Sequence, residues 1–123
     1  MRTRQWPVQD ICLYLPPVDF RKSIDGLAAI VELELERDPF ASTLFVFSNR
    51  HRDKVKLLYW ERNGFVMWYK RLEKQHFNWP KHQTDAQSEP LSNEQLSWLL
   101  DGIDISRLTP HSELQYEAVL NPF

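Results

Sequence analysis

The segment from Lys54 to Glu73 constrains the fold most, because two runs of strand-forming residues flank an Asn63-Gly64 pair. Aromatic and β-branched residues that alternate with polar ones favour strands, and Asn-Gly favours the positive φ angles of a type I′ turn. The segment therefore predicts a β-hairpin with Asn63 and Gly64 as its loop. In this register Lys56 lies directly opposite Arg71.

The two faces of the predicted hairpin differ in chemistry. One face carries mostly apolar side chains, such as Val55 and Leu57, and should press on a core. The other face mixes aromatics with cations. There, Lys56 opposite Arg71 sets like charges side by side, which is unfavourable unless an anion or a carboxylate such as Glu73 lies nearby. This second face is therefore either a solvated sheet surface or an anion-binding surface.

The length and composition indicate one domain. The chain has 123 residues, of which 42% are hydrophobic, and this is enough for a single core. No apolar run approaches the roughly 20 residues of a membrane span, and no signal-peptide pattern follows the first residues. We therefore expect a cytoplasmic protein with no membrane contact. The single cysteine, Cys12, lies in an apolar run and is expected to be a buried small residue.

Charge is unevenly distributed along the chain, although the net charge is only -2. Residues 50–74 contain eight Lys or Arg and three Asp or Glu, whereas residues 75–123 contain two and seven. A basic middle suits contact with phosphate. The acidic C-terminal part could equally bind that middle, within the molecule or in a neighbouring copy.

Two helices are predicted outside the hairpin. Asp19 is a natural N-cap, and apolar residues at spacings of three and four predict a helix from about Phe20 to Glu36. A second helix is predicted near 92–101, because Ser92 and Gln95 form a capping-box pattern. Gly102 is placed to end that helix in a left-handed conformation.

Three further strands complete the predicted sheet. We expect a buried strand at 11–15, another at 43–47, and a short edge strand at 76–80, with the polar stretch 81–90 as a loop. The fold prediction is α+β, with a curved antiparallel sheet of four or five strands, one main helix packed across a face and a second short helix near the C-terminus.

Several short motifs occur in order along the chain. They are Asp19-Phe-Arg-Lys-Ser-Ile-Asp-Gly-Leu27, Asp38-Pro-Phe40, Leu44-Phe-Val-Phe47, Lys54-Val-Lys-Leu-Leu-Tyr-Trp60, Asn63-Gly64, Lys70-Arg-Leu-Glu73, Phe77-Asn-Trp-Pro80 and Leu99-Leu-Asp-Gly-Ile103. With this order and spacing, the chain resembles the accessory TnpB (Orf2-like) protein of the IS66-type insertion-sequence transposon family.

The resemblance implies a small bacterial protein that is encoded beside a separate transposase and assists movement of the element. It implies no established catalytic set. It also suggests boundaries, with residues 1–10 as an N-terminal extension, 11–105 as the single accessory-protein domain and 106–123 as a C-terminal tail.

The leading functional hypothesis is a non-catalytic accessory protein that binds DNA at the element ends, or helps to assemble the transposase complex, through the basic and aromatic hairpin face. Cations would contact phosphate, and Trp60 or Tyr69 would stack on an exposed base, with core packing as the alternative for each aromatic. The predicted phosphate-binding residues are Arg21, Lys22, Arg50, Arg52, Lys54, Lys56, Lys70, Arg71 and Lys74.

A second hypothesis is a protein-interaction module that recruits or stabilises the transposase without contacting DNA. Trp79, Trp98 and the acidic C-terminal part would form its contact surface, since aromatic anchors suit interfaces. The net charge of -2 favours this hypothesis, because a dedicated duplex-binding protein is usually basic overall. An exposed sheet edge would also allow a homo-dimer.

A third hypothesis is a metal-dependent nuclease. It draws on carboxylates that lie near basic residues in the sequence, because two-metal phosphoryl chemistry needs paired carboxylates. Their spacing matches no metal motif, and the four histidines form no zinc pattern, so we predict no metal site and no cofactor. The carboxylates concerned are Asp19, Asp25, Asp53, Glu61 and Glu73.

Overall fold

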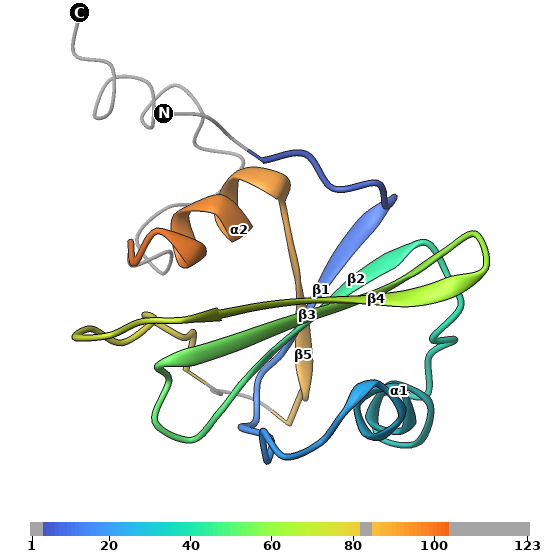
Figure 1. Cartoon of the computed structure of the whole chain (residues 1–123), viewed down its shortest axis with the longest axis horizontal. Coiled ribbons are helices and arrows are strands. Elements are labelled where there is room, and N and C mark those ends of the chain that lie inside the picture. Colours follow the sequence, from blue (N-terminus) through green and yellow to red (C-terminus); the bar gives the residue numbers. More distant parts are fainter. Residues whose placement is uncertain (1–3, 82–84, 104–123) are drawn as a thin grey trace, which may run out of the picture.

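The computed structural model describes residues 4–81 and 85–103, which form a five-stranded sheet with a helix against each face (Figure 1). The strands follow the order β4-β3-β2-β1-β5 across the sheet. The α+β class, the main helix on one face and the short second helix are confirmed. The elements are β1 (Asp10–Tyr14), α1 (Ile24–Leu33), β2 (Thr43–Ser48), β3 (Lys54–Glu61), β4 (Gly64–Arg71), β5 (Ser88–Leu91) and α2 (Asn93–Leu100).

The sheet is mixed. β1 and β2 run parallel, whereas the pairs β2–β3, β3–β4 and β1–β5 are antiparallel. The parallel pair follows from α1, which carries the chain from the end of β1 back to the start of β2. The prediction of antiparallel pairing therefore holds everywhere except at this crossover.

The β3–β4 hairpin forms as predicted, but its register is offset by two residues. Glu61 pairs with Gly64, so Arg62 and Asn63 form the loop, and Arg62 rather than glycine takes a positive φ of 58°. Asn63 N–H donates to Glu61 O at 2.6 Å and closes this tight turn. Because an offset of two residues is even, each side chain keeps its predicted face.

The corrected register changes the partners of the strand cations. Lys56 lies opposite Tyr69, and Arg71 lies opposite Lys54. Like charges therefore do face each other across the ladder, but at the first residue of β3, where side chains reach solvent more easily.

Two apolar clusters fill the space on either side of the sheet. On one face, Ile11, Leu13, Val55 and Leu57 pack with residues of α2. On the other face, alternate residues of the same strands pack with Leu27 and Val31 of α1, the two residues of that helix that are fully buried; these strand residues are Cys12, Tyr14, Phe45, Phe47 and Leu58. The face of the sheet that carries Lys56 is therefore partly covered by α1 and the residues around it. The prediction that Cys12 is a buried small residue is confirmed, since it is 2% exposed.

The main helix is shorter than predicted. It begins at Ile24 with Ser23 as its N-cap, because Asp19 hydrogen-bonds to Arg21 instead of capping a helix. The second helix agrees with prediction. Ser92 and Gln95 form the capping box, and Gly102 follows the helix with a φ of 86°.

The fifth strand was predicted in the wrong segment. It forms at Ser88–Leu91, beside β1 at the sheet edge, where Pro90 is tolerated because no further strand needs its missing N–H. Residues 76–80 form no strand. Instead, Phe77 is buried and its N–H donates to Arg52 O at 2.7 Å, which ties this segment to the β2–β3 turn.

Most of the predicted N-terminal extension, residues 1–10, lies within the described residues. Trp6 and Val8, in the predicted N-terminal extension, pack against the α2-side core, and Asp10 begins β1. The predicted tail, 106–123, lies outside the described residues. Neither described helix has the length and apolar character needed to cross a membrane.

Candidate functional site

The topology gathers three connecting segments at one end of the sheet. β1, β2 and β4 finish at this end and β3 begins there. Backbone hydrogen bonds join the segments: Val18 N–H donates to Ser48 O at 2.9 Å, and Leu72 N–H donates to Asp53 O at 2.8 Å. We call this region the basic end and define it by the exposed or partly exposed cations Arg21, Lys22, Arg50, Lys54, Arg71 and Lys74.

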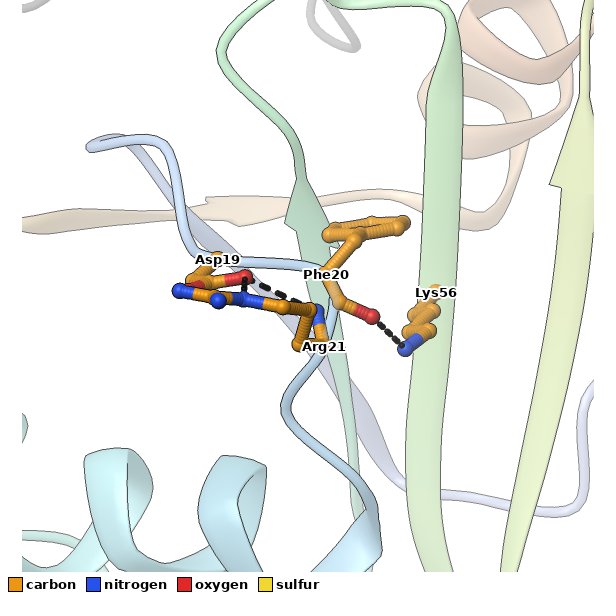
Figure 2. Close-up of polar contacts among 4 residues, drawn as sticks. All are labelled: Asp19, Phe20, Arg21 and Lys56. Carbon is orange, nitrogen blue, oxygen red and sulfur yellow. Dashed lines mark hydrogen bonds and ion pairs between the residues drawn. The ribbon is translucent and has the colours of Figure 1, made fainter.

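Lys56 holds the loop between β1 and α1 in place. Its ammonium donates to Phe20 O and to Lys22 O, each at 2.9 Å, and lies 4.7 Å from the centre of the Phe20 ring. Figure 2 shows Lys56 reaching from its strand to the Phe20 carbonyl. Burial lowers the pKa of Lys56, whose residue is only 7% exposed.

The prediction that Lys56 lies on an open, phosphate-accessible face is therefore wrong. Its charge faces two backbone carbonyl oxygens and an aromatic ring, because the β1–α1 loop folds over this part of β3. Lys56 is a positioning residue that fixes the loop carrying Arg21 and Lys22.

Asp19 and Arg21 form a compact ion pair on the same loop. The Asp19 carboxylate accepts a hydrogen bond from the Arg21 backbone N–H at 2.9 Å, and another from Arg21 Nη2 at 2.6 Å (Figure 2). The Arg21 side chain is 91% exposed, so the pair lies in solvent at the basic end. Hydrogen bonds from Arg21 lower the pKa of Asp19 from 3.8 to about 2.

This ion pair gives a pH-dependent signal. Because the pKa of Asp19 is lower in the folded protein, the pair contributes stability above about pH 4, and this contribution is lost as the pH falls through about 2. An NMR titration of the side-chain carboxyl carbons should give Asp19 a midpoint near 2, and Arg21→Ala should return that midpoint toward 3.8. An Asp19 midpoint that is the same in both proteins would contradict the hydrogen-bonded pair.

Four cations of the basic end make no direct ion pair with the described residues, although Asp19 lies near Lys22 and Asp53 near Lys54. Among the described residues, Lys22, Arg50, Lys54 and Lys74 have no carboxylate within ion-pair distance. Arg71 does pair with Glu73, at 3.0 Å, but both side chains are more than half exposed, and such a pair is weak and easily exchanged for another anion. The basic end therefore carries excess positive charge toward solvent.

Asn49, which is not among the predicted site residues, shapes the turn that carries Arg50. Its Nδ2 donates to Asp53 Oδ1 at 2.6 Å, and its Oδ1 accepts from the backbone N–H groups of Asp53 and Lys54 at 3.2 and 3.1 Å. An asparagine in a polar turn between two strands is the signal that could have identified it.

Arg52 and Lys70 are bound to backbone carbonyls. Arg52 Nη2 donates to Leu15 O at 3.1 Å, and the guanidinium lies 5.2 Å from the centre of the Trp79 ring. Lys70 Nζ donates to Leu100 O at 2.9 Å, where a cation also complements the C-terminal end of α2. The basic end as defined above therefore includes neither residue.

The aromatic candidates lie in different surroundings. Tyr69 is 46% exposed and its ring centre is 6.3 Å from that of Phe20, so it stays near the basic end. Trp60 packs at the opposite end of β3, with ring centres 4.9 Å from Phe40 and 5.1 Å from Phe65. Trp60 is thus separated from the cations of the basic end, with which it was predicted to share a DNA-binding face.

The two tryptophans assigned to a partner surface also differ. Trp98 is 4% exposed and belongs to the α2-side core, so it is not available as an exposed contact residue. Trp79 is half-buried, and its indole Nε1 donates to Tyr14 O at 3.3 Å.

The structure does not gather the carboxylates of the nuclease hypothesis. Asp19 binds Arg21, Asp53 accepts from Asn49, which lowers its pKa, and Glu61 lies at the far end of β3. Within residues 4–81 and 85–103, no group of three or more His, Cys, Asp or Glu is placed to hold a metal ion.

Comparison with known proteins identifies the family. The model of the IS66 Orf2-like protein family matches residues 9–110. The uncharacterized protein y4jC of Sinorhizobium fredii is 35% identical over 92 residues, which cover 75% of this chain and 77% of that protein. The uncharacterized protein y4hO of the same organism is 35% identical over 86 residues, which cover 70% of this chain and 73% of that protein. No solved structure matches. The chain therefore belongs to the IS66 Orf2-like family, the accessory proteins of transposition by IS66-type insertion sequences.

Proposed function

We propose that this protein is a non-catalytic accessory factor that binds DNA during transposition through the basic end of its sheet. The observation that carries the proposal is the convergence of exposed cations from three separate chain segments, which hydrogen bonds hold together. Family membership supports a role in transposition. Binding to the element ends together with the transposase would follow from both.

The charge of the basic end sets the expected strength of the electrostatic contribution. Phosphates attract Lys and Arg largely without regard to sequence, and each neutralised phosphate releases condensed counterions. If Lys22, Arg50, Lys54 and Lys74 each contact one phosphate, the logarithm of the duplex-binding constant should fall with the logarithm of salt concentration with a slope of about -4.

The proposal is tested with duplex DNA carrying an element end and with a scrambled duplex, measured by fluorescence anisotropy over a range of salt concentrations. Arg50→Glu should weaken binding about tenfold at low salt and make the slope shallower by about one. Arg62→Glu is the matched control, because Arg62 is also an exposed turn arginine but lies at the opposite end of β3.

Two outcomes would overturn the DNA-binding proposal. One is the absence of duplex binding by the unchanged protein at low salt. The other is an equal loss of affinity in Arg50→Glu and Arg62→Glu, because that would reflect overall charge rather than a site. A preference for the element end over the scrambled duplex would add base or shape readout to phosphate contact.

Recruitment of the transposase is a second candidate function, which the exposed ring of Phe40 favours. This side chain is 56% exposed and packs edge-on against Trp60, at the end of the sheet opposite the basic end. Exposed aromatic anchors are enriched at protein interfaces. Phe40→Ala should then weaken co-purification with the transposase while leaving duplex binding unchanged. Dimerisation through a sheet edge stays a prediction.

A further inference from the structure

A groove lies beside the basic end, and the proposed function gives it no role. Its volume is about 560 Å³, within the range of small-ligand pockets. Flat, apolar side chains form much of its lining and two cations border it. The lining residues that matter here are Pro16, Pro17, Arg52, Trp79, Pro80 and Lys81.

Arg52 gives the groove an uncompensated positive charge. Its Nη2 donates to Leu15 O, but its buried Nη1 has no hydrogen-bond partner among the described residues, and neither nitrogen faces a carboxylate there. Burial without a counter-charge also lowers the pKa of Arg52. Lys81 is exposed and lines the same groove. An anionic ligand would compensate both charges.

Trp79 gives the groove a rigid aromatic wall. The indole is fixed by its hydrogen bond to Tyr14 O and by the Arg52 guanidinium, which lies 5.2 Å from the ring centre. An aromatic side chain that is already fixed loses little conformational entropy when a flat ring stacks on it. Flat apolar walls beside one fixed cation, Arg52, and one exposed cation, Lys81, match a ligand that combines a planar ring with phosphate.

We propose that this groove holds one unpaired nucleotide of single-stranded DNA, with the base against Trp79 and the adjoining prolines and with flanking phosphates at Arg52 and Lys81. The inference rests on the proposed function, because Arg52 belongs to the turn that also carries Arg50 of the basic end. The two sites together would follow a strand that leaves the duplex. The protein should therefore bind a duplex with an unpaired extension more tightly than a blunt duplex.

The test compares a labelled oligothymidine of about 12 nucleotides with a blunt duplex, by anisotropy at one salt concentration. Lys81→Glu should weaken single-strand binding about tenfold and blunt-duplex binding less than about twofold, with Arg62→Glu as the exposed control for charge reversal. Trp79→Ala should weaken single-strand binding about tenfold, whereas Trp79→Phe, which keeps a flat ring, should retain most of the affinity.

Trp79 also packs on the core, so circular dichroism must show that each Trp79 variant is folded, and Lys81→Glu provides the test if Trp79→Ala is not. Equal effects of Lys81→Glu on both DNA forms, or no effect on either, would overturn the groove assignment. Duplex binding that still depends on Arg50 would then leave the proposed function standing. Absence of binding to both DNA forms would overturn the two proposals together.

Discussion

Replacing Lys56 by methionine is expected to lower the free energy of unfolding by about 3 kcal/mol. Methionine keeps the length and apolar stem of the side chain but cannot donate a hydrogen bond. The carbonyl oxygens of Phe20 and Lys22 would then lose the ammonium that binds both of them at 2.9 Å, and removal of a buried charge would offset only part of the loss.

Urea denaturation followed by circular dichroism measures this effect, and the chain offers a close control. Lys54 is on the same strand and the same face, two residues earlier, but it is partly exposed and its ammonium forms no ion pair with the described residues. Lys54→Met should change stability by less than about 0.5 kcal/mol. Similar values for the two variants would show that Lys56 does not hold the loop.

Replacing Trp98 by alanine is expected to cost about 4 kcal/mol of stability, because it opens a large cavity in the α2-side core. Trp98 is 4% exposed and packs in the same cluster as Leu57 and Leu99. The corresponding control is Leu33→Ala, since Leu33 is 73% exposed and little packing is lost there. Denaturant midpoints of the two variants give the comparison.

The same experiment separates a core role from a contact role for Trp98. A folded Trp98→Ala protein with unchanged stability and weaker transposase binding would contradict the core assignment. The expected result is a Trp98→Ala protein that is less stable even in isolation, without the transposase.

The local parts of the fold were predictable from sequence. The β3–β4 hairpin follows from alternating residues around a turn, and the N-terminus of α2 follows from the Ser92 and Gln95 capping box. In each case the residues that determine the structure lie within a few positions of one another. The hairpin register was missed because Arg62, which has no glycine-like preference, takes the positive φ of the loop.

The remaining errors concern contacts between distant segments. β5 contains a proline and only four residues, and it exists because β1 offers it a partner at the sheet edge. Asp19 has the chemistry of a helix cap, yet Arg21 competes for its carboxylate, and Ser23 takes the cap position. Propensity alone does not decide such competitions.

In the candidate site, too, local features were predictable and contacts between distant segments were not. The sequence placed most of the cations on segments that do meet at one end of the sheet, because the order of strands and turns brings them there. It could not show that Lys56 is covered, since alternation assigns a residue to a face but does not reveal which loop lies over that face. Burial of Trp98 and of Arg52 likewise depends on packing partners far away in the chain.

The contact between Lys56 and the β1–α1 loop is made through main-chain carbonyl groups. Every amino acid has such a carbonyl, so the hydrogen bond that Lys56 donates at position 22 does not require a particular side chain there. We therefore expect a substitution of Lys22 to leave the hydrogen bonds of Lys56 in place. A substitution at position 22 would then change what the loop presents to a ligand, whereas a substitution at position 56 would change whether the loop is held at all.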